Sequence, residues 1–157
     1  MAISVFPAPA AAVREVWTLI ESKAASGSSV TFNSFSGYKH LFLSGKGISK
    51  SGSSHIKIRP NNNSTAGNYS HNWNGGNSDA FLTSSNISAD EAMSFIIYNV
   101  DQTSPKQVIA QWDSSIASHD KDAFIDTVAV TSLVVLTHGG ATPTFTAGTF
   151  YLYGILA

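Results

Sequence analysis

The chain of 157 residues has no cysteine and little charge. Without cysteine there is no disulfide framework, no thiolate nucleophile and no thiolate metal ligand. Charged residues make up 12% of the chain, about half the usual fraction. The net charge is −1 with histidine neutral, and no long basic run provides the electrostatic footprint of a protein that binds nucleic acid or an anionic membrane. We therefore expect neither nucleic acid nor a membrane as a partner.

Residues 127–157 contain no charged side chain at all. In a soluble domain, so long an uncharged stretch is core strand or surface that meets a partner. A membrane-spanning helix needs about 20 consecutive apolar residues, and here His138, the glycines that follow it and Pro143 interrupt the run. We predict two buried strands joined by a Gly/Pro loop, and we expect another subunit to cover part of this surface.

Alternation of apolar and polar residues is the main structural signal in the rest of the chain. It predicts strands at 38–43, 55–59 and 150–155, and one bent strand or two over 124–136. Residues 13–22 could form a helix face with Trp17 and Ile20, but their Val, Trp, Thr and Ile favour a strand, which we predict. Residues 95–100 are apolar on both faces, which predicts a central strand. Residues 106–116 fit a strand or a short helix, and residues 88–91 fit a single capped helical turn. Turn clusters rich in Gly, Ser and Asn separate these segments. The pattern predicts an all-β protein, an antiparallel, jelly-roll-like β-sandwich, with residues 13–157 as a single domain.

Two predicted strands carry polar residues of particular interest. In residues 55–59, alternation places the isoleucines inward and Lys57 and Arg59 outward, which we interpret as a solvated strand face rather than a phosphate site. His40 alternates with Tyr38 and Phe42, so we interpret it as a packed side chain rather than a metal ligand.

Residues 1–12 are predicted to be an extended, uncharged N-terminal arm. Pro7 and Pro9 oppose a helix there and favour extended backbone before each proline. Val5 and Phe6 supply apolar side chains, so these four residues form a possible subunit-docking arm that adds to a neighbouring sheet edge. The segment lacks the basic flank and apolar core of a signal peptide.

No motif in the chain identifies a reaction, a metal site or a cofactor. The five histidines form no zinc-ligand spacing. There is no phosphate-binding Gly-rich loop and no Gly-x-Ser-x-Gly elbow. The acids available for hydrolase chemistry are linked by no motif, and they are Asp79, Asp90, Glu91 and Asp113. We therefore predict a non-enzymatic protein without a cofactor, and a hydrolase stays the least favoured alternative.

Aromatic and amide residues alternate in residues 68–74. Tyr69, His71 and Trp73 are candidate contacts for a glycan or a protein partner, because aromatic rings stack on sugars and amides satisfy their hydroxyls. The competing interpretation, which we favour, is a hydrogen-bonded loop with Tyr69 and Trp73 inserted into the core.

Several segments, in order along residues 17–155, together resemble a group of small β-rich bacteriophage virion proteins. The segments are Trp17-Thr18-Leu19-Ile20, Val30-Thr31-Phe32, Tyr38-Lys39-His40-Leu41, Ile58-Arg59, Asn68-Tyr69-Ser70 and Phe150-Tyr151-Leu152-Tyr153-Gly154-Ile155. The group is similar to jelly-roll or sandwich modules that decorate phage capsids or belong to tail fibres and baseplates.

The resemblance implies a non-enzymatic capsid decoration (cement) protein located in the virion after synthesis in the host cytoplasm. Its partners would be the major capsid protein or other virion proteins, and its assembly a homotrimer. The alternative is a tail-fibre or baseplate module that binds host surface glycans. No shared catalytic residue of the group is carried over to this chain.

Overall fold

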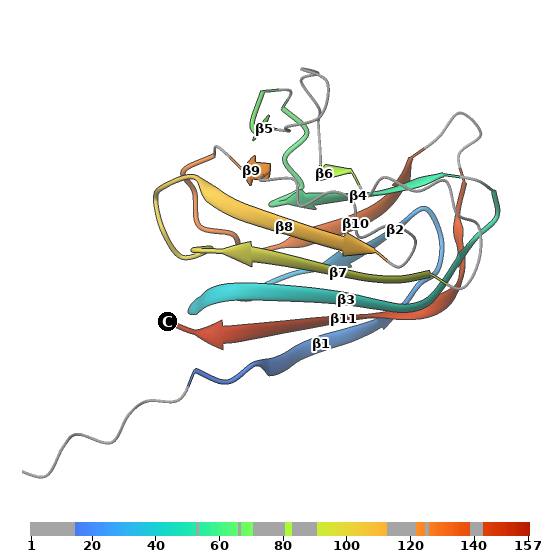
Figure 1. Ribbon diagram of the computed structural model, residues 1–157, viewed down its shortest axis with the longest axis horizontal. Helices are drawn as coiled ribbons and strands as arrows, with labels where there is room; N and C mark the ends of the chain where they lie inside the picture. The colour runs from blue at the N-terminus through green and yellow to red at the C-terminus, as the bar shows by residue number, and fades with distance from the viewer. Residues whose placement is uncertain are drawn as a thin grey trace, which may run out of the picture.

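The computed structural model describes residues 15–52, 54–65, 67–70, 81–82, 91–112, 122–124, 126–138 and 143–157. These residues form two antiparallel sheets packed face to face, which confirms the predicted all-β sandwich (Figure 1). The larger sheet has the order β1-β11-β3-β7-β8-β9-β5, and the smaller has the order β2-β10-β4-β6. No helix within the described ranges has the length and apolar character needed to cross a membrane.

The strands of the larger sheet are β1 (Thr18–Ala24), β3 (Tyr38–Lys50), β5 (Tyr69–Ser70), β7 (Glu91–Tyr98), β8 (Lys106–Trp112), β9 (Asp122–Phe124) and β11 (Phe145–Leu156). Those of the smaller sheet are β2 (Ser29–Phe32), β4 (His55–Pro60), β6 (Phe81–Leu82) and β10 (Leu133–His138).

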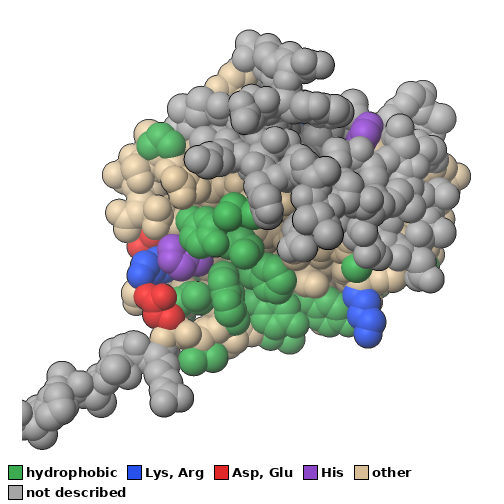
Figure 2. All heavy atoms as spheres, in the orientation of Figure 1, with side chains coloured by type: hydrophobic (Ala, Val, Ile, Leu, Met, Phe, Trp, Pro, Cys, Tyr) green, Lys and Arg blue, Asp and Glu red, His purple; other side chains and the backbone are tan. Residues whose placement is uncertain are grey.

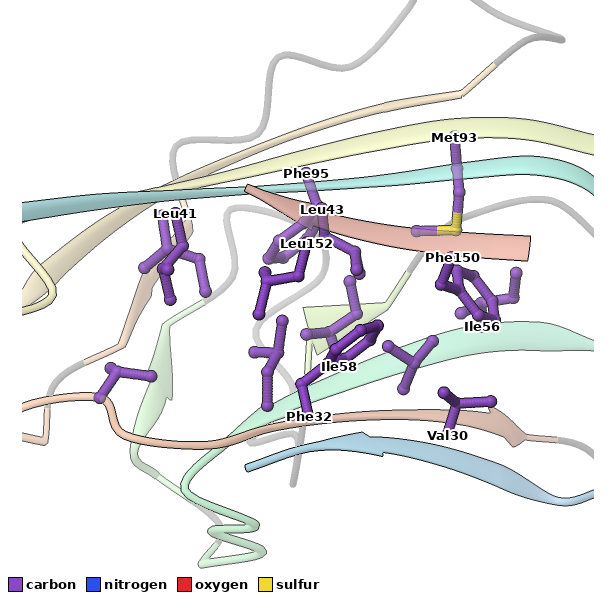
Figure 3. Close-up of a cluster of buried hydrophobic side chains, with 14 of the residues drawn as sticks. Val30, Phe32, Leu41, Leu43, Ile56, Ile58, Met93, Phe95, Phe150 and Leu152 are labelled. Carbon is purple, nitrogen blue, oxygen red and sulfur yellow. The ribbon is translucent and has the colours of Figure 1, made fainter. Parts of the chain in front are cut away.

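One core fills the space between the sheets, because alternate residues of each strand point inward. Figure 3 shows side chains from β3, β7 and β11 facing those from β2 and β4. The fully or nearly fully buried residues include Phe32, Leu41, Leu43, Ile56, Ile58, Phe95, Phe150 and Leu152. The alternation predicted for residues 38–43 and 55–59 is therefore confirmed.

Two predicted segments differ in detail from the observed strands, and the structure decides between the two alternatives for a third. Residues 124–136 were expected to be one bent strand or two. Instead β9 ends at Phe124, no strand is assigned at 126–132, and β10 begins at Leu133. Residues 106–112 are a strand rather than a short helix, and Glu91, placed in a helical turn by its sequence, begins β7.

The two C-terminal strands predicted in the uncharged stretch are present as β10 and β11. They lie in different sheets and do not pair with each other. β10 pairs with β2 and β4, and β11 pairs with β1 and β3. Burial of β10 and much of β11 between these neighbours explains most of the missing charge.

Lys57 corrects the prediction of a solvated charged face on residues 55–59. Its side chain is 6% exposed. Arg59 is half-buried, while Ile56 and Ile58 are fully buried as expected. A long apolar stem allows a lysine to occupy a covered position that its charge alone would not favour.

The segment at 126–132 is fixed by polar contacts to other strands. Lys106 is fully buried, and its ammonium donates to the backbone oxygens of Asp126 at 2.9 Å and Val128 at 2.6 Å. Asn61, in the left-handed region at φ 52°, donates to the backbone oxygen of Ala129 and accepts from the Thr131 amide. These contacts replace the ladder bonds that a strand would have made.

Candidate binding face on the seven-stranded sheet

A row of five apolar side chains crosses the outer face of the larger sheet. The pairing register places Leu19 opposite Tyr153, Tyr153 opposite Phe42, Phe42 opposite Ile96, and Ile96 opposite Ile109. Directly opposed residues of antiparallel strands lie on the same face. The row therefore runs over β1, β11, β3, β7 and β8, and at strand spacings of about 4.8 Å it is about 19 Å long.

The row is open to solvent. Leu19 is 50% and Ile109 40% exposed, and Phe42, Ile96 and Tyr153 are half-buried. Figure 2 shows hydrophobic side chains gathered on this face, with charged side chains only at the edges of the gathering. A contiguous apolar surface of this kind indicates a binding surface.

Trp17, which precedes β1, turns the row into a hollow. Its ring centroid lies 5.7 Å from that of Phe42, and the Phe42 centroid lies 5.9 Å from that of Tyr153. These three rings and Ile96 line a hollow of about 300 Å³. Trp17 is itself 40% exposed. The hollow can accept a compact apolar group that packs against aromatic faces and edges.

A polar rim borders the row on one side. The His40 ring packs edge-on against Tyr98 at 5.2 Å, and its Nδ1 accepts a hydrogen bond from the Asn99 amide at 3.1 Å. His40 is thus packed between neighbours, as its sequence context predicted. Beside it, Lys39 donates to Glu15 Oε1 at 2.8 Å.

The Glu15–Lys39 pair is exposed, and each partner shifts the pKa of the other. The hydrogen bond from Lys39 and its charge lower the pKa of the Glu15 carboxyl. The same bond and the Glu15 charge raise the pKa of the Lys39 ammonium. Both groups therefore stay ionised at neutral pH, at the margin of the apolar row rather than within it.

The chemistry available on this face is packing rather than catalysis. The next row along the strands is formed by Ser22, Tyr151, Ser44 and Ser94, which offers hydroxyls but no charge. Among the described residues, no group of three or more His, Asp or Glu side chains is placed to hold a metal ion. The face can bind a partner whose surface is apolar or packs against aromatic rings, and hydroxyl groups beside the row can form hydrogen bonds with it.

Of the sequence-predicted contact residues, the structure describes Tyr69, which lies in the core rather than on this face. Tyr69 is 2% exposed, packs against Phe124 at 5.2 Å and donates its hydroxyl proton to the Asn63 backbone oxygen. This burial corrects the expectation of Tyr69 as an exposed glycan contact, since no ring face is left for a sugar, and it agrees with the core interpretation. His71 and Trp73 lie outside the described residues.

The remaining predicted residues, apart from Glu91, lie outside the described part of the chain. The arm residues Val5, Phe6, Pro7 and Pro9 lie outside the described ranges, as do Asp79, Asp90 and Asp113. Glu91 is the first residue of β7.

The sequence interpretation missed Trp17, Phe42, Ile96 and Tyr153 as a group. One signal was available. Residues 95–100 are apolar on both faces, which predicted a central strand, and β7 does lie between β3 and β8. The outer half of that pattern is not core, however, because Ile96 lines the solvent-facing hollow.

No protein-family model matches the chain, and no curated protein sequence matches it.

Proposed function

We propose that the protein is a non-enzymatic structural component of a bacteriophage particle, a capsid decoration (cement) protein that bridges capsid subunits. The observation that carries the proposal is the uncharged apolar row from Leu19 to Ile109 on the outer face of a rigid sheet. The centres of protein interfaces are depleted of charge and enriched in aromatic residues, as this face is. The assignment to a phage particle is supported by the ordered sequence resemblance over residues 17–155.

The strand order supports the jelly-roll-like version of the sandwich. The first strand, β1, lies beside the last, β11, and β2 lies beside β10. β3 then lies on the other side of β11, and β4 on the other side of β10. Such nested pairing, with the chain alternating between sheets, is expected when Greek keys build a double-sheet jelly roll.

We propose a homotrimer seated on the major capsid protein or another virion protein. Closed rotational symmetry lets identical faces be covered without open-ended growth. Support comes from β11, which carries no charge and still presents the half-buried rings of Tyr151 and Tyr153 on the outer face. These rings belong to the charge-free stretch, and the core of one copy buries them only in part.

The test is rebinding of the full-length protein to phage capsids stripped of it. Wild-type protein should rebind, and Ile109→Glu should not, because it buries an unpaired charge at one end of the row. Val128→Glu is the matched control, since Val128 is 58% exposed and lies outside the row. Equal rebinding by both variants, or labelling of the protein only at the tail tip, would exclude the capsid-bridging role.

A second candidate is a tail-fibre or baseplate module that recognises host surface glycans. The observation that favours it is the set of rings around the hollow, the exposed Trp17 and the half-buried Phe42 and Tyr153, beside the row of serine and tyrosine hydroxyls. Sugars stack on such rings. A glycan array should then show binding that Trp17→Ala abolishes. Absence of binding, or binding that the substitution does not change, removes this candidate.

A further inference from the structure

We propose that the hollow formed by Trp17, Phe42, Ile96 and Tyr153 receives residues Val5–Pro9 of a second copy of this chain. The inference rests on the proposed function: within the proposed homotrimer the neighbouring copy fills the hollow, and the ends of the row, Leu19 and Ile109, remain for the capsid. It assigns to each copy one receiving hollow and one donated segment, so that the subunits are linked in a ring.

The hollow fits a short extended segment better than a folded surface. Its volume of about 300 Å³ is at the lower end of ligand pockets. Its lining has three aromatic rings and one isoleucine and no charged side chain. Aromatic-lined grooves are the usual receptors for proline-containing extended segments, which enter them already ordered.

Val5-Phe6-Pro7-Ala8-Pro9 has the chemistry to occupy it. The segment carries no charge, so no ion loses its hydration on docking. Each proline fixes its own φ and restricts the residue before it to extended conformations. Less conformational entropy is therefore lost when the segment is ordered.

The place where the described chain begins favours a second copy over the same copy. The Glu15–Lys39 pair holds residue 15 at the rim, and Trp17 already lines the hollow. Reaching the hollow of the same copy would require the chain to reverse direction between Pro9 and Glu15. The intervening sequence is Ala-Ala-Ala-Val-Arg, which has none of the Gly, Pro, Asn, Asp or Ser residues that build turns. We therefore assign the donated segment to a second copy.

The free edge of β1 is a poorer receptor for the segment than the hollow. The β1–β11 register shifts between Leu19 and Glu21, which interrupts a regular edge. Glu21 and Lys23 then place a 3.2 Å ion pair along this edge strand. Irregularity and charge on an edge strand oppose the addition of another strand. We therefore place the segment on the sheet face rather than at its edge.

The test uses full-length protein, and the absence of cysteine makes an introduced thiol unique. Ala10→Cys carries a benzophenone photocrosslinker next to the intact Val5–Pro9 segment. This light protein is mixed with isotopically heavy wild-type protein, irradiated and digested for mass spectrometry. We expect adducts between the light residue 10 and heavy peptides that contain Trp17, Phe42, Ile96 or Tyr153.

A double variant of the donated segment provides the specificity control. Pro7→Ala with Pro9→Ala in the light protein should abolish the heavy adducts without changing any residue of the described sandwich. Adducts confined to the light chain itself, adducts on β1 instead of the hollow, or no adducts would each overturn the inference. If adducts are absent while Ile109→Glu still prevents capsid rebinding, the arm exchange fails and the proposed function stands.

Discussion

At the scale of single residues, Gly148 is held where no other residue fits well. Its φ is +102°, and a Cβ there would lie 2.5 Å from the Gly47 backbone oxygen. The residue sits in β11 where the pairing with β3 shifts register, so neither backbone can move away freely. The bulge thus depends on a missing side chain.

We predict that Gly148→Ala lowers the free energy of unfolding by roughly 2 kcal/mol or more, through overpacking and left-handed backbone strain. Gly52→Ala is the matched control, because nothing lies within 4 Å of its Cβ position. It should change stability by no more than about 0.5 kcal/mol. Denaturant unfolding of both variants checks this, and coincident curves would contradict it.

The buried lysine makes a second residue-scale prediction. Burial lowers the pKa of the Lys106 ammonium from the ordinary 10.5, and the Asp126 charge opposes that shift only in part. Between the folded pKa and 10.5 the unfolded chain binds more protons than the native state. The Lys106 contribution to the free energy of unfolding therefore rises with pH across this window.

Lys106→Met should remove that rise and, at neutral pH, destabilise the fold by about 1 to 3 kcal/mol, because the Asp126 and Val128 oxygens lose their donor. Unfolding curves measured from neutral pH toward 10.5 should show the free energy of unfolding of wild type rising relative to that of Lys106→Met. Lys46→Met, at an exposed position of β3, is the control and should keep the wild-type pH dependence. If the stability of Lys106→Met changed with pH in parallel with that of wild type, the lowered pKa of Lys106 would not be the cause of the rise.

At the scale of elements, β7 separates the core from the binding face within two adjacent residues. Ile97 is 1% exposed and belongs to the core, whereas Ile96 lines the hollow. Ile97→Ala should cost about 2 to 5 kcal/mol of unfolding free energy. Ile96→Ala should cost much less and instead weaken capsid rebinding, because the hollow that it lines joins the subunits of the proposed trimer. Thermal unfolding and the rebinding assay on the same two variants check this. A larger loss of stability for Ile96→Ala than for Ile97→Ala would mean that Ile96, not Ile97, belongs to the core.

Strands were predictable where apolar residues alternate on one face only. β4 was found this way because its inward residues, Ile56 and Ile58, alternate with polar ones. β7 was placed centrally for a sound reason, its apolar residues on both faces. That pattern cannot tell a face covered by the same chain from one left for a partner.

Contacts between distant segments were not predictable from local patterns. Lys106 is buried because carbonyls 20 and 22 residues later in the chain receive its ammonium. The apolar row depends on the register of five strands, from Leu19 in β1 to Tyr153 in β11. Alternation predicts which side chains of a strand point toward the core, but only the pairing register of the strands places the five apolar residues side by side.

At the scale of the whole molecule, the polar and apolar features are separated. The hydrogen-bonded contacts of Lys106 and Asn61 fix the 126–132 segment, whereas the hollow and the apolar row lie on the outer face of β1, β11, β3, β7 and β8. A docked subunit would therefore meet apolar surface first, with one ion pair, Glu15–Lys39, at its margin. This arrangement has a consequence for how association should respond to salt.

We predict that capsid rebinding is nearly independent of salt. Raising the salt from about 0.1 M to about 1 M shortens the screening length from about 10 Å to about 3 Å. The row has no charge to screen, and the rim pair is exposed and contributes little. Calorimetry of the full-length protein with stripped capsids should give affinities within about twofold across this range, with a negative heat-capacity change from apolar burial.

An affinity that falls tenfold or more with salt would mean that a charged surface elsewhere makes the contact. Glu15→Gln is the control, since it should leave both affinity and salt dependence unchanged if the apolar row carries the binding.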